Sequence, residues 1–539
     1  HVVEELALAS GVPVPEIYVL EQEMGINAFA AGYAPGDAAV AVTRGALEIL
    51  DRDELQGVIG HEFSHVLNGD MRLNIRLMGV LFGIMALGLI GRMAFRGSYY
   101  AGATSRRGKG GNVVLIIGLG LIILGGIGVF SARLIKSGVS RQREFLADAS
   151  AVQFTRQTDG LAGALKKIGG YKESSLLTAT DPEEVSHMLF GTGMNLSGMF
   201  ATHPPLIERI RALDPNFDEG DYPRVRLQDR KVAAESGVDQ RASGIAAATS
   251  AMAAGISPGS ISESVGQPTE EHIAFATRIR QSIPENLYDA AHSSELSYLL
   301  VIALVLDSRD AAREHQVTLL TEKLGEQRSK LIEQFFADLQ QAGPAYRLPL
   351  LEIAFPALRQ RPAPQLSFLL KLTARLIEID GEVELHEFCF YRVLATNLRQ
   401  VMNPSRGQKR QRAGRKPVRE AAVQLLRIVA EFGHDDTTGA AAAFRAGMRH
   451  FGDWGDAYSY ESGKRVSTSE LEKSIDQLVA LNGEGRQMLL DSVTSVVMHD
   501  EQLTVTEAEL VRTICASLEI PLPPQIGVSL NSVPGSGSQ

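Results

Sequence analysis

The chain has 539 residues, enough for two or more domains with cores of their own. Its formal net charge of -10 argues against general binding to nucleic acid, and we expect no nucleic-acid partner. The two cysteines, Cys389 and Cys515, are too few for a disulfide framework.

Residues 1–70 are predicted to form a small β-sheet followed by a helix. The β-leaning runs EIYVL, INAFAAG and AAVAVTRGAL are separated by turn residues such as Pro35-Gly36-Asp37. Asp51 or Asp53 can cap a helix through ELQGVIGHEFSHVL. Gly69 is placed to end that helix.

Two apolar segments follow and predict a transmembrane helical hairpin, at about residues 73–95 and 113–132. The second contains twenty residues without a charge, which matches the helical length that a bilayer requires. The first is shorter, so a re-entrant or buried-core helix stays open as its alternative. Basic residues flank the hairpin five against six, so charge does not decide its orientation.

The rest of the chain predicts further helical units. Residues 1–218 form the first domain, and 219–262 have the Ala, Ser and Gly composition of a flexible linker. Apolar residues at helical spacing predict helical regions over 263–342 and 343–526. Residues 527–539 read as a disordered tail.

The second helical region contains a weak internal repeat between 369–398 and 489–518. Each unit is predicted to be a helix, an acidic turn and a second helix. The acidic residues of the turns are Asp380, Glu382, Asp500 and Glu501. They could bind a cation, although capping of the following helix by Asp or Thr is the simpler reading.

The segment HEFSH, from His61 to His65, carries the main chemical signal. Residues i and i+4 lie on one face of a helix, so the two histidines can share one metal ion. Zinc held by three protein ligands keeps a fourth position for water. Glu62 is then placed to act as a general base on that water.

A third ligand must come from elsewhere, and SRQREFLADAS offers two acids four residues apart. From the residues alone, either Glu144 or Asp148 could bind the metal. The other could accept a hydrogen bond from a ligating histidine.

At this point the chain resembles the HtpX-type membrane metallopeptidases, relatives of the CAAX-prenyl endopeptidases. The motifs are NAFAAG, AVAVTRGALEIL, GVIGHEFSHVLNGD, SRQREFLADASAV and ATHPPLIERIRAL, and the match covers about residues 1–215. The resemblance implies one Zn²⁺ per chain, with His61, His65 and Glu144 as ligands and Glu62 as base. It also implies that Asp148 lies near His61.

Two further site residues are expected with less support from the motifs. His203 is the expected stabiliser of the oxyanion, with capping of the Pro204-Pro205 turn as its alternative. Asn27 is the expected polar contact to a substrate that pairs with an edge strand, with a turn role as its alternative.

The expected fold is therefore mainly α with a small β-sheet. An α+β zincin-type peptidase domain with a transmembrane hairpin precedes an all-α C-terminal region. The resemblance implies a multi-pass protein of the cell inner membrane, with its peptidase and C-terminal domains in the cytoplasm. Because residue 1 is His, we expect further chain upstream, where family members usually carry two more spans.

The expected function is a zinc-dependent endopeptidase that cleaves membrane or misfolded proteins at the bilayer surface. Two alternatives stay open: a membrane-tethered scaffold with a structural zinc site, and a CAAX-type processing enzyme. The repeat units resemble the TerB-like helical module of tellurite-resistance proteins. We interpret this half as a cytosolic interaction or regulatory module with a protein partner.

Overall fold

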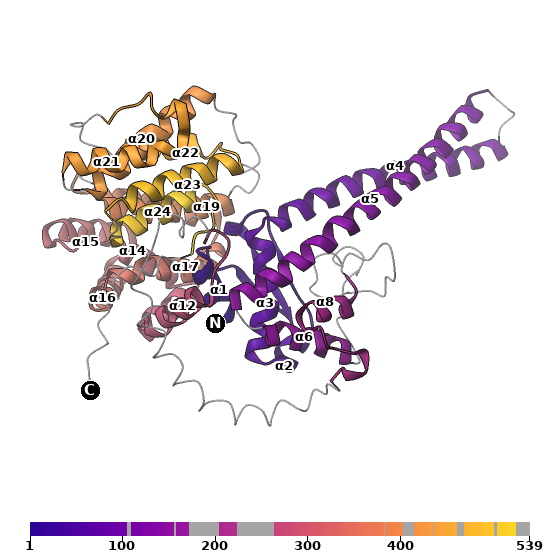
Figure 1. Cartoon of the computed structure of the whole chain (residues 1–539), viewed down its shortest axis with the longest axis horizontal. Coiled ribbons are helices and arrows are strands. Elements are labelled where there is room, and N and C mark those ends of the chain that lie inside the picture. The colour runs from indigo at the N-terminus through magenta and orange to yellow at the C-terminus, as the bar shows by residue number, and fades with distance from the viewer. Residues whose placement is uncertain are drawn as a thin grey trace.

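The computed structural model describes residues 1–104, 109–155, 158–171, 204–223, 264–381, 383–402, 414–434, 436–460, 468–500 and 504–523. Figure 1 shows a long helical hairpin projecting from one side of a body made of the N-terminal domain and a large set of C-terminal helices. The described part of the chain is mainly helical with one small sheet, as the sequence predicts. The predicted tail, 527–539, lies outside the described residues.

The sheet has three strands in the order β1-β3-β2. β1 (Glu16–Leu20) pairs parallel to β3 (Ala39–Thr43), and β2 (Ala28–Ala31) pairs antiparallel to β3. Between β2 and β3 the Pro35–Asp37 turn forms a short 3-10 helix, η1. The arrangement leaves β2 as an edge strand, and it lies against α3, which carries the HEFSH segment.

Helix α1 (Val2–Ser10) precedes the sheet, and α2 (Arg44–Ile49) and α3 (Arg52–Leu67) follow it. Asp51 caps α3: its Oδ1 accepts from Glu54 N at 2.9 Å, and Glu54 Oε2 accepts from Asp51 N at 2.8 Å. Gly69, with φ 71°, lies in the turn that ends α3, and the next helix begins directly after it at Asp70. The predicted start and end of this helix are therefore correct within one residue.

Helices α4 (Asp70–Thr104) and α5 (Lys109–Thr155) form the projecting hairpin. Close approach of glycine backbones joins them, since a Cβ at Gly125 would lie 2.7 Å from Gly88 Cα. One segment of the described chain, Asp70–Gly97, is long and apolar enough to cross a membrane, and Ile116–Gly128 is a shorter apolar helix.

Helices α6 (Thr158–Gly170) and α8 (Leu206–Leu213) complete the N-terminal domain, followed by η2 (Glu219–Asp221). Tyr222, at the start of the predicted linker, packs its ring 5.1 Å from that of Phe217. The rest of that linker, from residue 224, lies outside the described residues.

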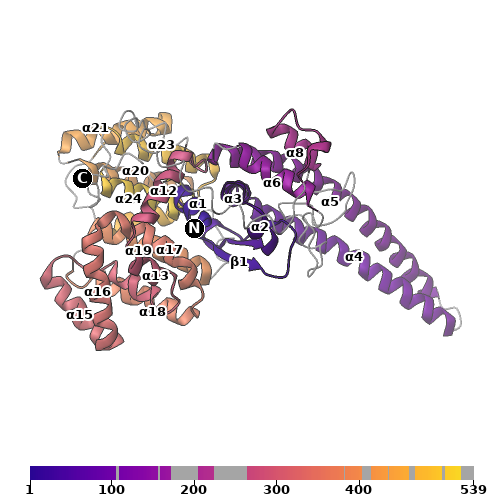
Figure 2. The ribbon, with the colours of Figure 1, turned by 90° about the horizontal axis from the view of Figure 1, so that it is seen from below.

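The C-terminal helices form two layers that Figure 2 shows beside the N-terminal domain. The first set is α12 (Glu270–Ser282), α13 (Glu285–His292), α14 (Ser297–Ala303), α15 (Asp310–Leu324), α16 (Glu326–Ala342), η3 (Pro344–Tyr346), α17 (Arg347–Arg359), α18 (Ala363–Ile377) and α19 (Leu385–Met402). The second set is α20 (Arg415–Gly433), α21 (Thr437–Met448), η5 (Arg449–Trp454), α22 (Thr468–Leu478), α23 (Gly483–Val497) and α24 (Val505–Ser517).

The two segments of the predicted repeat are both helical hairpins, α18–α19 and α23–α24, and α19 packs on α24. Thr504 caps α24, because its hydroxyl accepts from Glu507 N at 3.2 Å. In the first acidic turn, Asp380 is paired with Arg309 at 2.7 Å, so a protein cation already faces it. Glu382 and Glu501 lie outside the described residues.

Helix α3 depends on a glycine where it crosses α6. A Cβ at Gly57 would lie 2.8 Å from the backbone nitrogen of Leu161, which no rotamer change can relieve. We expect Gly57→Ala to destabilise the domain by about 1–3 kcal/mol, the usual cost of overpacking. Thermal unfolding of the detergent-solubilised protein measures this as a lower Tm.

The matched control is Gly79→Ala in α4, where a Cβ would meet nothing within 4 Å. This control should leave the Tm unchanged or raise it slightly, because alanine favours the helix. Equal unfolding temperatures for both variants would contradict the close packing of α3 on α6.

Candidate metal centre

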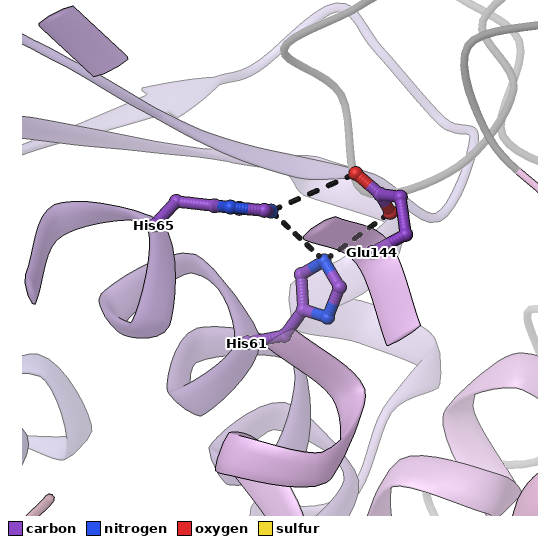
Figure 3. Close-up of side chains that lie close together, drawn as sticks. All are labelled: His61, His65 and Glu144. Atoms are coloured by element: carbon purple, nitrogen blue, oxygen red, sulfur yellow. Dashed lines mark hydrogen bonds and ion pairs between the residues drawn. The ribbon is translucent and has the colours of Figure 1, made fainter. Parts of the chain in front are cut away.

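Two helices bring the predicted ligands together. His61 and His65 lie one turn apart on α3, and Glu144 reaches them from α5, as Figure 3 shows. The two imidazole Nε2 atoms are 3.3 Å apart. Glu144 places Oε2 at 3.5 Å from His61 Nε2 and Oε1 at 3.7 Å from His65 Nε2.

These separations fit one tetrahedral ion. Ligand atoms about 2.0–2.1 Å from a tetrahedral zinc lie roughly 3.3–3.4 Å from one another. Among the described residues, His61, His65 and Glu144 are the group whose spacing suits a metal ion. The donor set of two imidazoles and one carboxylate also suits zinc and keeps a fourth position open.

The ligands are held by buried partners. His61 Nδ1 lies 2.8 Å from Asp148 Oδ1, and Asp148 lies one turn beyond Glu144 on α5. His65 Nδ1 lies 2.9 Å from Asp70 Oδ2 at the start of α4. Both contacts leave the Nε2 atoms directed at the shared position, which fixes the tautomer that a metal needs.

Arg209 of α8 completes this buried set. Its Nε and Nη2 donate to the two carboxylate oxygens of Asp148 at 2.8 and 2.7 Å, and its Nη1 lies 3.8 Å from Glu144. The side chain is only 1% exposed. A buried guanidinium requires such partners, since an unpaired charge there would be very costly.

Three groups of the centre have shifted pKa values, and the causes are geometric. Burial opposes ionisation of Asp148, but the charge and hydrogen bonds of Arg209 lower its pKa to about 2. Burial alone would lower the pKa of His61, whereas its contacts with Asp148 and Glu144 raise it to about 9. The pKa of His65 is lowered, first by burial and then by the charge of His61.

Glu62 lies beside the ligands with 2% of its surface exposed. Its Oε2 accepts a hydrogen bond from the backbone nitrogen of Ala30 in the edge strand β2, at 3.0 Å. Burial raises its pKa above the usual value for a glutamate, although the neighbouring histidines oppose this rise. A carboxylate that is both fixed and more basic than usual is suited to proton transfer.

Asn27 lies at the start of β2 and is fully buried. Its Oδ1 accepts from Ala28 N at 3.0 Å, and its own backbone nitrogen donates to Thr43 Oγ1 at 2.9 Å. In this structure Asn27 supports the edge strand, and its contact with substrate stays a prediction. His203 lies outside the described residues.

The sequence reasoning missed Arg209 and Asp70. Arg209 lies within the ATHPPLIERIRAL motif, but an arginine on an amphipathic helix usually reads as solvated. Asp70 follows directly after Gly69, where an acid reads as the first turn of a new helix. Both residues lie within motifs that carry the family resemblance, and this was the available signal.

The arrangement suits a mononuclear metal centre of the two-histidine, one-glutamate class, with a further buried glutamate beside it. The peptidase family M48 model matches residues 1–216. A protease HtpX homologue of Dictyoglomus thermophilum is 42% identical over 217 residues, which are 40% of this chain and 67% of that protein.

Two more HtpX homologues show the same extent of similarity. That of Caldanaerobacter subterraneus is 42% identical over 219 residues, and that of Streptococcus uberis is 36% identical over 226 residues. Each match covers 40% of this chain, and they cover 70% and 71% of the relatives. No solved structure matches the chain.

The chain therefore belongs to peptidase family M48, among the HtpX homologues, and it is a metallopeptidase. The resemblance inferred from the motifs is confirmed. The matches end near residue 216, so they do not describe the helices from α12 onward.

Arg209 provides a test of the buried support for the ligands. Replacing it by methionine removes the partner of Asp148 and frees that carboxylate to move from His61. We expect Arg209→Met to weaken metal binding by about 10–100-fold, the usual effect of losing an outer partner of a ligand. Metal retained during dialysis against graded chelator concentrations gives the measurement.

Arg211→Met is the matched control on the same helix, because the Arg211 side chain is 50% exposed and pairs with Asp218. Its metal affinity should equal that of the unchanged protein. A similar loss in both variants would point to general damage to α8 and count against the role of Arg209.

Proposed function

We propose that the protein is an integral-membrane, zinc-dependent endopeptidase whose general base is Glu62. The observation that carries this proposal is the set of ligand atoms 3.3–3.7 Å apart with Glu62 one residue from His61. A structural zinc site would have no use for a buried carboxylate held next to the open position. This argues against the scaffold alternative.

His61, His65 and Glu144 would hold the zinc ion. Bound there, zinc supplies Lewis-acid chemistry, which acidifies water and polarises a peptide carbonyl. Glu62 accepts a proton from the attacking water and then passes it to the leaving amine. The backbone N–H of Ala30 fixes one oxygen of Glu62, so the other is free to face the water. His203 is the proposed stabiliser of the oxyanion.

The edge strand β2 is the proposed substrate-binding element. The N–H of Ala30 points to Glu62 and away from β3, so alternate backbone groups of β2 face the catalytic residues. The amides of Ala28 and Ala30 already donate to Asn27 and Glu62, so an extended peptide would pair with β2 by donating its own N–H groups to the carbonyls on that edge. Such pairing selects for extended conformation more than for one sequence, which suits unfolded segments of membrane proteins as substrates.

The hairpin α4–α5 is proposed to span the membrane, with the peptidase and C-terminal domains on the cytoplasmic side of the inner membrane. Its apolar side chains point outward. Among those with more than a third of their surface exposed are Val80, Phe82, Leu87, Leu89, Ile90, Ile116, Ile117, Ile123, Leu124 and Ile127. Glycines line the inner face, where Gly91 and Gly118 bring the helices together. A hairpin that turns apolar residues outward fits a lipid environment better than water.

The mechanism is tested with Glu62→Gln. This variant keeps the size of the side chain but removes the proton acceptor, so metal content should stay unchanged while kcat falls by about 10²–10⁴-fold. Cleavage of casein in detergent and metal analysis of the same sample give the two readouts. His65→Ala should lose metal and activity together.

Glu21→Gln is the control for the same chemical change, since Glu21 has a 66% exposed side chain on the sheet side of the domain. It should retain full activity. Undiminished proteolysis by Glu62→Gln, with metal bound, would refute the proposed base.

Membrane insertion is tested at Leu124, whose side chain is 68% exposed in the middle of the second apolar segment. An arginine at the centre of a span costs about 2.5–3.5 kcal/mol on insertion. Leu124→Arg should therefore move protein from the carbonate-resistant membrane fraction to the extractable fraction. Phe368→Arg, an exposed apolar position on α18, should leave this partition unchanged. A wild-type protein that is itself extracted by carbonate would overturn the proposal.

A further inference from the structure

The C-terminal helices do not stand apart from the peptidase domain. One continuous hydrophobic core contains residues of α1, of the sheet and of α12 to α19. Helix α1 packs against α12 and α17. A shared core of this kind does not allow the two parts to move independently, as separate domains on a linker would.

Buried charges on α1 strengthen this contact. Glu5 is 2% exposed and lies between Arg52 of α3, at 2.6 Å, and Arg280 of α12, at 3.0 Å. Glu4 accepts from Tyr288 at 2.7 Å and contacts His292 at 2.6 Å, both on α13. The C-terminal region is therefore fixed in orientation relative to the catalytic helix α3.

This fixed orientation brings the C-terminal region onto the segment that follows the edge strand, Gly32–Ala38, which we call the rim loop. Asp37 closes the rim loop on itself, because its Oδ1 accepts from Tyr33 N at 2.9 Å and Ala34 N at 2.6 Å. The rim loop continues β2 directly. A peptide paired with β2 and longer than that strand would meet the rim loop next.

Helix α19 packs against the rim loop at Gly36. A Cβ at Gly36 would overlap Gln400 Oε1 and lie 3.3 Å from Asn397 Oδ1, so the lack of a side chain at Gly36 lets these two polar side chains of α19 contact the rim loop. At the end of the rim loop, Arg359 of α17 donates to Ala38 O at 3.4 Å. Two separate C-terminal helices thus hold one side of the rim loop.

Arg72, in the first turn of α4, holds the other side. Its Nε donates to Tyr33 O at 2.9 Å, and its Nη2 lies 3.7 Å from Glu519, just after α24. Glu519 also faces Arg486 of α23 at 3.9 Å. Among the described residues Glu519 is the non-glycine residue with positive φ, 57°, a backbone conformation that residues other than glycine rarely adopt.

We infer that the C-terminal helical region is a positioning element of the substrate groove, which fixes the rim loop and so determines how the enzyme binds extended substrates. This inference rests on the proposed function. The contacts of Glu62, His61 and His65 described above are with residues of the N-terminal domain, so we expect short substrates to need β2 alone. Longer unfolded segments need the rim loop as well, and they depend on α19 and Glu519.

The test uses the full chain in detergent and two internally quenched peptides with the same scissile centre, one short and one extended in both directions. In Gly36→Val the new side chain takes the position of Gln400 Oε1, so Gln400 is displaced and its contact with the rim loop is lost. We expect KM for the extended peptide to rise about tenfold, equivalent to a loss of about 1.4 kcal/mol of binding. Kinetics on the short peptide should stay within about twofold of wild type.

The double variant Gly36→Val/Gln400→Ala should restore most of the binding of the extended peptide, because removing the Gln400 side chain returns the space that valine takes. Gly220→Val is the matched control, since a Cβ there meets nothing within 4 Å. It should behave as wild type on both peptides.

A second, independent variant is Glu519→Gly. Glycine tolerates the positive φ of this position, so the fold is kept while the carboxylate facing Arg72 is lost. It should raise KM for the extended peptide in the same direction as Gly36→Val. Equal effects on short and extended peptides, or no rescue by Gln400→Ala, would overturn the inference.

Failure of the proposed function gives a different result from failure of this inference. If the wild-type protein cleaves neither peptide although metal is bound, the peptidase function itself is wrong. If wild type cleaves both peptides and the variants discriminate neither, the peptidase function stands and only the positioning role falls.

Discussion

The structure depends on one constraint: the charged and histidine side chains of the proposed metal centre are buried almost completely. His61, Glu144, Asp148 and Arg209 are each between 1% and 3% exposed. Burial of any one of these groups without a partner would cost free energy, and it is tolerated because each group contacts another that offsets its charge. Arg209 neutralises the charge of Asp148, Asp148 orients His61, and the proposed metal ion would bind His61 and Glu144. Three helices, α3, α5 and α8, are therefore tied together by the same atoms that prepare the chemistry.

The same constraint explains what could be predicted from the sequence. The ligands of α3 follow from i, i+4 spacing, and its start follows from Asp51, because both are local rules. The choice between Glu144 and Asp148 is not local. In the structure Glu144 faces both Nε2 atoms and Asp148 faces His61 Nδ1, which favours Glu144 as the proposed third ligand. Arg209 was missed because its burial results from the docking of a distant helix.

The docking of the C-terminal helices could not be predicted either. The spacing of their apolar residues indicates helices. The same spacing is found whether the helices form a separate module or share a core with a neighbouring domain. Glu4 and Glu5 would read as ordinary acids in the first turn of α1. Only the structure pairs them with Arg280, Tyr288 and His292. A long segment with the composition of a linker therefore does not prevent the C-terminal helices from packing tightly against the N-terminal domain.

Helix α5 carries one more consequence. It runs without interruption from the apolar segment to Glu144. If the span ends near residue 132, the helical turns between that point and Glu144 place the carboxylate about 18 Å beyond the end of the span along the helix axis, at 1.5 Å per residue. An extended chain covers that height in roughly five or six residues. Under the proposed function, the length of α5 would therefore set a minimum: a membrane-protein substrate would have to expose an unfolded segment of that length before its backbone could reach the proposed zinc site.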